Sequence, residues 1–263
     1  MENKKIEFAG VRAKLYEQAL ARYPNAREDD IKIMKKLLNP KTGEHILGFG
    51  EGNGFFCNAI AEAVGSTGKY LITDPSQDQL KGLESRVKCP WAEVKVAGAE
   101  ELNVGARSFD KVWSFGAFHH CPNQTMAMKH IYNSLRYGGK VVICDVFQGS
   151  NLAKHFDVQV ARYCNTGHEV KFLSDEFARS LCYLAGFEDS KVKIVEFNQK
   201  WRFDNEKSLG DFVYKLHAMT KLSGNMKEKI DKTVEGCRDI LGYKFVNGLY
   251  ELNWPMKALV AEK

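Results

Sequence analysis

The order of hydrophobic and polar residues predicts a regular alternation of strands and helices through the middle of the chain. Short apolar runs predict strands at 44–49, 69–73, 92–97, 109–114 and 140–146. Apolar residues at helical spacing predict helices between them, at 54–64, 78–87 and 123–135. Strands that alternate with helices are typical of a mostly parallel sheet with helices on both faces. We therefore expect an α/β fold whose sheet binds ligands at the carboxyl ends of its strands.

On either side of this core the pattern is more helical. Before it, helices are predicted at 8–23 and 28–38. After it, residues 150–172 are expected to be irregular or weakly helical. The remaining elements are predicted to be helices at 174–185, 206–222 and 226–241, and strands at 191–197 and 249–262, the latter with a kink at Pro255. We expect a single domain, divided into a helical cap at 1–43, a core at 44–200, a helical insertion at 201–247 and a last strand at 248–263.

The most informative stretch joins the first strand to the helix that follows it. It reads His45-Ile-Leu-Gly-Phe-Gly-Glu-Gly-Asn-Gly54, with glycines at the alternate positions 50, 52 and 54. Glycine lets the backbone turn tightly and approach a ligand closely, and the N-terminus of the next helix exposes N–H groups. Asp74 ends the second strand, twenty positions after Gly54. An acid at that place can accept hydrogen bonds from both hydroxyls of a ribose.

Three interpretations of this stretch compete. The first is a tight strand-to-helix turn that binds no ligand. The second is a dinucleotide site, but its G-x-G-x-x-G pattern does not fit, since Phe55 follows Gly54 in a run spaced G-x-G-x-G. The third follows from that spacing, which resembles motif I of the class I S-adenosylmethionine (SAM) methyltransferases. The preceding strand, the following helix and Asp74 favour the third interpretation.

Other stretches are similar to the UbiE-like group of this family, also called methyltransferase type 11. They are 109–114 with 118–123, the turn at 135–140, the segment from 172 to 187, and the end of the chain from 254 to 263. The resemblance implies a Rossmann-like, doubly wound sheet of seven strands, mostly parallel with an antiparallel last strand. It also implies that SAM is the cofactor and S-adenosyl-L-homocysteine the product.

The resemblance further implies which residues hold the cofactor at the carboxyl edge of the sheet. They are Gly50, Glu51, Gly52, Gly54, Asp74, Pro75, Ala99, Glu100, Phe115 and His119. For three of them an alternative stays open. Asp74 would also suit the cap of a helix, Glu51 either orients the methionine amino group or is simply solvated, and Glu100 either caps a turn or contacts the adenine.

Two positions depart from the pattern of the family. Gly48 stands where the family usually carries an acid, two residues before the first glycine of motif I. Gly98 stands where an aspartate often meets the amino group of adenine. The adenine would then be held by backbone groups near Ala99 or by Glu100. The absence of an acid at 48 or at 98 is expected to lower the affinity for SAM, or it indicates that the chain binds a related ligand.

Histidines provide the candidates for a catalytic base. His119 and His120 follow the fourth strand, and His119 matches the family position that faces the methyl donor. A neutral imidazole can accept a proton from a hydroxyl or an amine; the alternative is a loop histidine bonded only to backbone. His168, beside Glu169, is a second candidate base. Methyl transfer mainly requires that the acceptor atom, methyl carbon and sulfur lie in line, so it needs no large catalytic constellation.

The methyl acceptor is expected to bind among the variable segments outside the sheet. Aromatic residues are frequent there, and those predicted to contact the acceptor are Tyr16, Tyr23, Phe147, Tyr163 and Trp201. Aromatic residues at helical spacing more often belong to a hydrophobic core. Their number nevertheless indicates a covered site for a small, partly apolar molecule.

Composition and charge exclude some classes of function. The 263 residues carry a net charge of +5, from 38 basic and 33 acidic residues scattered along the chain, which does not indicate nucleic-acid binding. The seven cysteines have no C-x-x-C spacing, which favours reduced thiols over disulfides or a metal site. No apolar run approaches the ~20 residues of a membrane span, and no signal-peptide pattern is present. We expect a cytoplasmic protein, monomeric or homodimeric.

Together these observations predict an enzyme, a SAM-dependent methyltransferase that acts at O, N or C of a small, partly apolar molecule. A protein of this fold that uses SAM or a derivative without methyl transfer is the alternative, which Gly48 and Gly98 keep open. An RNA or protein methyltransferase is the third interpretation.

Overall fold

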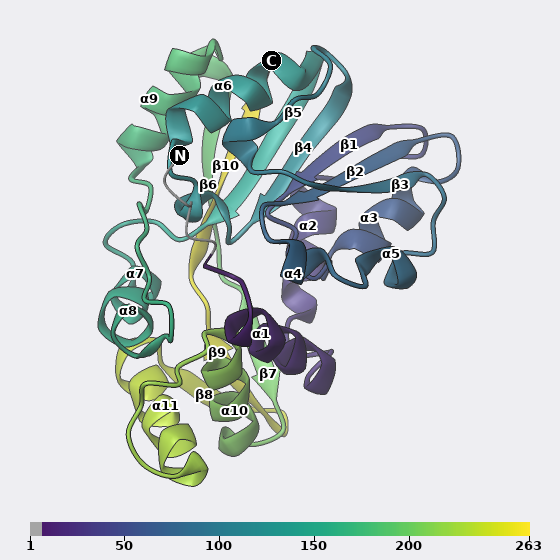
Figure 1. Cartoon of the computed structure of the whole chain (residues 1–263). Helices are drawn as coiled ribbons and strands as arrows, with labels where there is room; N and C mark the ends of the chain where they lie inside the picture. The colour runs from purple at the N-terminus through teal and green to yellow at the C-terminus, as the bar shows by residue number, and fades with distance from the viewer. Residues whose placement is uncertain (1–6) are drawn as a thin grey trace, which may run out of the picture. The chain divides into compact units, whose positions relative to one another are not determined.

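The computed structural model describes residues 7–263, apart from the side chains at 84 and 85, and the chain divides into two compact units. The large unit comprises Ile31–Gln148, Val170–Phe197 and Lys257–Lys263. The small unit comprises Met1–Asp30, Gly149–Glu169 and Asn198–Met256. Figure 1 shows the elements of both, coloured along the chain. Each unit is described by itself.

The large unit is built on a sheet of seven strands, as the sequence predicts. They are β1 (His45–Phe49), β2 (Lys69–Asp74), β3 (Ala92–Val96), β4 (Phe109–Phe115), β5 (Leu135–Asp145), β6 (Val192–Phe197) and β10 (Met256–Glu262). Their order is β3-β2-β1-β4-β5-β10-β6. The pairs from β3 through β5 are parallel, and β10 runs antiparallel to β5. The predicted fold class, with its antiparallel last strand, is confirmed.

Six helices and three short turns connect these strands. They are α2 (Glu28–Leu37), α3 (Cys57–Val64), α4 (Gln77–Leu80), α5 (Leu83–Arg86), α6 (Gln124–Ser134) and α9 (Asp175–Ala185), with 3-10 turns η1 (Ala99–Glu101), η2 (Phe118–His120) and η4 (Asp189–Lys191). Side-chain caps begin the longer helices, because Asn123 accepts from the N–H of Met126 and Ser174 from that of Phe177. Ser174, the first residue of the helix predicted at 174–185, is thus the N-cap of α9.

Different helices cover the two faces of the sheet. Val112 and Trp113 are successive residues of β4, so their side chains point to opposite faces. Val112 belongs to a hydrophobic core that also contains residues of α6 and α9. Trp113 packs against Phe56, just before α3, with ring centroids 5.2 Å apart. Helices α6 and α9 therefore cover one face and α3 the other, as expected for a doubly wound sheet (Figure 1).

Three predicted boundaries in the large unit differ from the structure. Helix α3 begins at Cys57, three residues later than expected, because the glycine loop continues through a series of turns. The helix expected at 78–87 is split into α4 and α5, since Gly82 adopts a left-handed conformation with φ +76°. The turn expected at Tyr137–Gly139 lies inside β5, where the pairing with β4 shifts between Phe109 and Lys111.

The small unit combines helices with a three-stranded antiparallel sheet (Figure 1). Its helices are α1 (Val11–Arg22), α7 (Asn151–His155), the π-helical segment η3 (Phe156–Val160), α8 (Ala161–Tyr163), α10 (Glu206–Leu216) and α11 (Met226–Ile240). Its strands are β7 (Lys200–Phe203), β8 (Tyr243–Val246) and β9 (Leu249–Asn253), in the order β7-β9-β8. Helix α10 packs against both α1 and α11.

Two predictions for this part of the chain differ from the structure. Residues 150–172, expected to be irregular or weakly helical, hold more helix than expected, because 151–163 form an unbroken helical run through α7, η3 and α8, and 164–172 lie outside helices and strands. The single last strand at 249–262 is two strands that belong to different sheets. Pro255 lies between β9 and β10, and a proline has no N–H to donate to a strand ladder. The segment 201–247, expected to be helical, also contains β8 and most of β7. The single-domain organisation stays a prediction.

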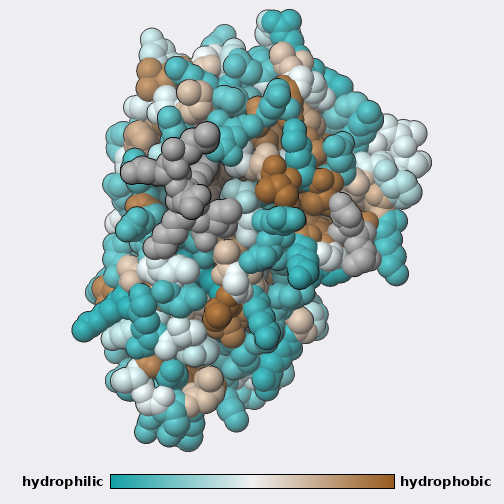
Figure 2. Space-filling model, viewed as in Figure 1, coloured by the Kyte–Doolittle hydropathy of each residue, from teal (hydrophilic) through white to brown (hydrophobic). Residues whose placement is uncertain are grey.

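The surface shows no feature of a membrane-spanning helix. Within residues 7–263, none of the helices has both the length and the apolar character needed to cross a bilayer. On the face drawn in Figure 2, hydrophilic residues dominate and hydrophobic ones gather in a few places.

The interior of the small unit contains a buried histidine. His155 ends α7, and its ring centroid lies 6.1, 5.9 and 6.0 Å from those of Phe156, His217 and Trp254. Neither of its ring nitrogens has a hydrogen-bond partner among the described residues. Burial lowers the pKa of His155 to about 4, because the charged imidazolium would lose its hydration.

We expect the chain to lose stability in acid through this residue. An unfolded histidine binds a proton near pH 6.5, whereas folded His155 stays neutral down to about pH 4. Because the unfolded state then binds more protons, the stabilisation is complete above pH 6.5 and falls as the pH drops to 4, by up to ~3 kcal/mol. The variant His155→Phe should lose this part of the pH dependence of the free energy of unfolding. Urea titrations at about pH 7.5, 6 and 4.5 measure it.

The matched control is His130→Phe, at a half-buried histidine of α6 in the large unit. It should leave the acid sensitivity of the chain unchanged. Equal pH dependence in the wild type and in His155→Phe would show that His155 does not hold its low pKa.

Candidate cofactor and active site

The loop between β1 and α3 requires its glycines for conformational and steric reasons. Gly50, Gly52 and Gly54 all have positive φ, at 64°, 54° and 83°, a region that L side chains rarely adopt. A Cβ on Gly50 would lie 2.2 Å from the Cβ of Ala117, and one on Gly54 would lie 2.2 Å from Cδ1 of Leu83. The loop therefore packs closely against the turn after β4 and against α5.

Asp74 ties this loop to the end of β2. Its Oδ2 accepts from the backbone N–H of Gly52 at 2.9 Å, and its Oδ1 accepts from that of Ser76 at 2.8 Å. The cap of α4 is Ser76, whose hydroxyl accepts from the N–H of Gln79, so Asp74 is not the helix cap that the alternative interpretation proposed. Burial raises the pKa of Asp74 to about 6. The carboxylate is thus fixed at the loop, where lone pairs remain for further donors.

Glu51 is buried rather than solvated. Only 7% of its surface is exposed, and its Oε1 accepts from the hydroxyl of Tyr70 on β2 at 2.6 Å. The thiol of Cys57, at the start of α3, lies 3.7 Å from its Oε2. Burial raises the pKa of Glu51 to about 7, against the opposing effect of the Tyr70 hydrogen bond. Of the two interpretations of Glu51, the structure excludes the solvated one.

The two glycines that depart from the family pattern each lie beside a glutamate side chain. A Cβ built on Gly48 would lie 2.2 Å from Oε1 of Glu51. One built on Gly98 would lie 3.2 Å from Oε2 of Glu100. Carboxylates from neighbouring positions therefore lie against both places where a side chain is missing.

The remaining predicted cofactor residues follow the ends of β2, β3 and β4. Pro75 is exposed between Asp74 and Ser76, Ala99 is buried in η1, and Phe115 ends β4 with its ring 5.0 Å from that of Phe56. Because the carboxyl ends of parallel strands meet at one edge of a sheet, these residues share the edge on which the glycine loop lies.

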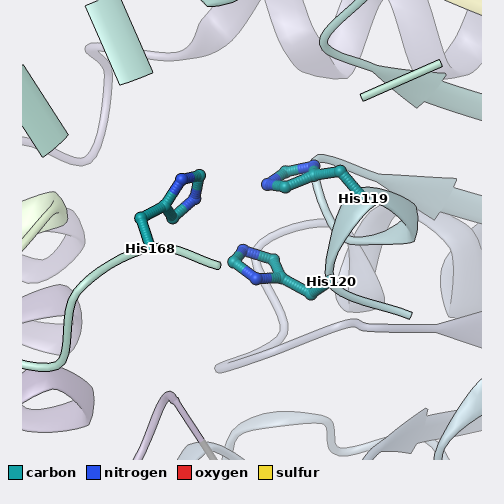
Figure 3. Close-up of side chains that lie close together, drawn as sticks. All are labelled: His119, His120 and His168. Carbon is teal, nitrogen blue, oxygen red and sulfur yellow. The ribbon is translucent and has the colours of Figure 1, made fainter. Parts of the chain in front are cut away.

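His119 is held by a buried carboxylate. It lies in the turn η2 after β4, and its Nδ1 is 2.5 Å from Oδ1 of Asp145. The backbone N–H of His119 also donates to Oδ2 of Asp145 at 3.0 Å. The exposed fractions of His119 and Asp145 are 3% and 0%. The ring of His120 lies beside that of His119, with centroids 4.2 Å apart (Figure 3). His119 is thus not a loop histidine bonded only to backbone.

Asp145 is the site residue that the sequence reasoning missed. It ends β5, next to the turn η2, and accepts from the N–H of Val146 at 2.6 Å in addition to its two contacts with His119. A signal was present in the sequence, because Asp145 is the only acid in the apolar run 141–147. A buried acid at the carboxyl end of a central strand is rarely tolerated without a partner.

The second candidate base belongs to the small unit. The ring of His168, the third histidine drawn in Figure 3, stacks on that of Phe156 with centroids 4.8 Å apart. The structure therefore brings His119 together with the cofactor residues of the large unit, and it describes His168 only within its own unit. A catalytic role for His168 stays a prediction.

The predicted acceptor residues make contacts inside their own units. Tyr23 donates to Asp211 at 2.8 Å, and the ring of Trp201 stacks on that of Trp254 with centroids 3.7 Å apart. The others are half-buried Tyr16 of α1, half-buried Tyr163 of α8, and Phe147, which is buried in the large unit beside Leu173. These contacts are typical of a hydrophobic core, and a role in acceptor binding stays a prediction for all five.

Comparison with known proteins supports the resemblance. A family model described as a methyltransferase domain matches residues 46–139, which contain the glycine loop, Asp74 and His119. Over this region the chain is similar to the class I SAM-dependent methyltransferases. Its curated relatives include arsenite methyltransferase of Halobacterium salinarum, 27% identical over 66% of this chain and 47% of that protein. Another is demethylmenaquinone methyltransferase of a Geobacillus species, 30% identical over 46% of this chain and 52% of the relative.

Solved structures agree on the fold. Phosphoethanolamine N-methyltransferase 2 of Haemonchus contortus, in complex with phosphomonomethylethanolamine and S-adenosylhomocysteine, superposes with a TM-score of 0.64. The identity is 20%, over 95% of this chain and 56% of that protein. The chain spans about half the length of the curated relatives it matches.

The residues of the large unit fit the cofactor of this family. The positive-φ loop leaves no side chain at Gly50, Gly52 or Gly54, and the Asp74 carboxylate is already oriented at the loop. A carboxylate is a suitable acceptor for the two hydroxyls of the ribose. Asp74 would hold the ribose of SAM, and the turn η1 with Ala99 and Glu100 would lie along the adenine.

We expect the affinity for SAM to depend on Asp74. The variant Asp74→Ala removes a charged hydrogen-bond acceptor and should weaken binding by about 1.5–3 kcal/mol, or roughly 10- to 150-fold in Kd. Isothermal titration calorimetry with SAM measures the change.

The matched control is Asp78→Ala, at an exposed acid on α4 four residues further on. It should bind SAM as the wild type does. Unchanged SAM affinity in folded Asp74→Ala would rule out Asp74 as the ribose ligand.

Proposed function

We propose that this protein transfers the methyl group of SAM to an O, N or C atom of a small, partly apolar molecule, with S-adenosylhomocysteine as the second product. The observation that carries the proposal is the buried pair of His119 and Asp145, 2.5 Å apart. Their turn abuts the glycine loop, since Ala117 and Gly50 leave no space between them. A base and a cofactor loop are thus neighbours at one edge of the sheet.

Asp145 determines which nitrogen of His119 acts as the base. An ionised carboxylate only accepts hydrogen bonds, so Nδ1 of His119 carries the proton that points to Asp145. The other nitrogen, Nε2, then has the lone pair that takes a proton from an acceptor hydroxyl or amine. As the imidazole becomes charged, Asp145 stabilises it. Bound SAM supplies a methyl group on a sulfonium, a good leaving group, so the protein mainly aligns the reactants.

The names of the relatives do not narrow the acceptor. They specify arsenite, demethylmenaquinone and phosphoethanolamine, which differ in charge, size and the atom methylated. What they share is that each is a small molecule, which supports that class over RNA or protein. We propose a small-molecule acceptor and a cytoplasmic protein that acts as a monomer or homodimer.

The alternative of a SAM-binding protein without methyl transfer rests on the glycines at 48 and 98. The carboxylates of Glu51 and Glu100 lie against both positions, so acidic groups are not absent from the site. The oriented pair of His119 and Asp145 would have no evident use in a protein that only binds SAM. These two observations favour methyl transfer.

We expect His119→Ala to lower turnover more than SAM binding. A base contributes in the transition state, so its loss should reduce the single-turnover rate by ~10²–10⁴-fold while SAM affinity stays within a few-fold. Asp145→Asn should lower the rate as well, because its side-chain N–H₂ group no longer holds the same tautomer of His119. Formation of S-adenosylhomocysteine, followed by mass spectrometry against a panel of small O, N and C acceptors, measures the rate.

The control is His130→Ala, which changes a histidine of α6 outside the proposed site. It should retain both SAM binding and rate. A parallel loss of SAM affinity and rate in His119→Ala would make His119 a cofactor or structural residue. A normal rate in His119→Ala would move the search for a base to His168.

A further inference from the structure

Glu51 is a buried carboxylate that lacks a cationic partner within residues 7–263. The groups that face it are the hydroxyl of Tyr70 from β2, the thiol of Cys57 from α3 and the carboxylate of Asp74 at the end of β2. None of them is positively charged. Buried carboxylates normally pair with a cation or take up a proton. A positive charge that neutralises Glu51 must therefore come from a ligand or from solvent.

The geometry of β1 is adapted to this carboxylate. A Cβ at Gly48 would lie 2.2 Å from Oε1 of Glu51 and 2.6 Å from the hydroxyl oxygen of Tyr70. Gly48 does not have a positive φ, so its backbone is open to other residues and only the space is lacking. The hydrogen bond between Glu51 and Tyr70, with both side chains as the structure places them, therefore requires a residue without a Cβ at 48.

We infer that Glu51 provides, from the glycine loop, the carboxylate that position 48 has no room to carry, and that Tyr70 holds it to bind the ammonium group of SAM. The inference rests on the proposed use of SAM and assigns one group of it to one residue. Tyr70 acts as a positioning residue, because its hydroxyl contacts Glu51 and not the ligand.

Binding of an ammonium group to Glu51 makes the affinity for SAM depend on pH. Burial raises the pKa of Glu51 to about 7, the nearby charge of Asp74 raises it further, and hydrogen bonds from Tyr70 and Cys57 oppose the shift. Only the ionised form attracts a cation. Affinity should therefore rise as the pH increases from 5.5 to 7, by about tenfold for a single group that titrates near 7.

The experiment compares SAM with 5′-methylthioadenosine, which has the same nucleoside but no amino-acid part. Both ligands carry the ribose, so a change in the charge of Asp74 affects them alike, and the ratio of their Kd values reports on the part of SAM that methylthioadenosine lacks, its sulfonium charge and its amino-acid group. Calorimetry across about pH 5.5–7 should give a ratio that changes about tenfold in the wild type. In the nearly isosteric variant Glu51→Gln the ratio should be independent of pH. SAM should bind that variant about 10- to 100-fold more weakly, and methylthioadenosine should bind unchanged.

Tyr70→Phe tests the positioning role. Loss of a hydrogen bond that opposes the raised pKa should move the pH midpoint of SAM binding upward, a change that a purely structural defect would not produce. The same readout in Cys57→Ala, which removes the longer contact, should move less. A midpoint that stays in place in Tyr70→Phe would overturn the role of Tyr70.

Moving the carboxylate from position 51 to position 48 tests whether an acid at either position can serve the same purpose. In the variant Gly48→Asp/Glu51→Ala/Tyr70→Phe, both atoms that block position 48 are removed and an acid is placed there. It should bind SAM more tightly than Glu51→Ala/Tyr70→Phe, whereas Gly48→Asp alone should bind worse than the wild type.

An unchanged ratio of SAM to methylthioadenosine affinity in Glu51→Gln would overturn the inference. Loss of SAM binding in Asp74→Ala would then still support SAM as the ligand, so the two failures are distinguishable.

Discussion

The connection between β1 and α3 is the constraint on which the site depends. Three residues with positive φ, Gly50, Gly52 and Gly54, return the chain across the end of the sheet. The return path places the loop against Ala117 after β4 and brings the N–H of Gly52 to Asp74 after β2. Any residue with a Cβ at Gly50 or Gly54 would push these elements apart. The positions of Asp74 and of the turn that carries His119 are therefore consequences of one backbone path.

A second property of this edge is its excess of buried negative charge. Burial raises the pKa of Asp74 to about 6 and that of Glu51 to about 7, and Asp145 is fully buried beside His119. Asp74 and Glu51 accept hydrogen bonds only from neutral groups, so these bonds offset only part of the free-energy cost of burying their charges. SAM carries positive charge on its sulfonium and its ammonium group. A site that leaves its acids poorly neutralised until a cation arrives is preorganised for such a ligand.

Periodicity was sufficient to predict the parallel core of the sheet, and the resemblance to the family supplied its antiparallel last strand. It was insufficient for the small unit, where β7 and β8 were missed and residues 150–172 were predicted to be irregular or only weakly helical. Short strands in a two-faced antiparallel sheet depend on their cross-strand neighbours, and the π-helical segment η3 disturbs the spacing that a helix pattern requires. The site shows the same division. Local spacing was enough to select Gly50, Gly52, Gly54 and Asp74 as candidates, whereas Asp145, the partner of His119, lies 26 residues away in sequence, at the end of β5.

The two departures from the family pattern show why a motif is better compared in space than in position. Read along the sequence, Gly48 and Gly98 are losses of acidic residues. In three dimensions the carboxylate of Glu51 lies against the first glycine and that of Glu100 against the second. In the first case a Cβ at 48 would lie 2.2 Å from Glu51 Oε1, so the flexible side chain of Glu51 would have to leave its hydrogen bond with Tyr70. The absence of a side chain at 48 is thus part of how the acid is accommodated. A side chain added at 48 while Glu51 stays would compete with the Glu51 carboxylate for one space. Removal of Glu51 while Gly48 stays would leave that space without an acid.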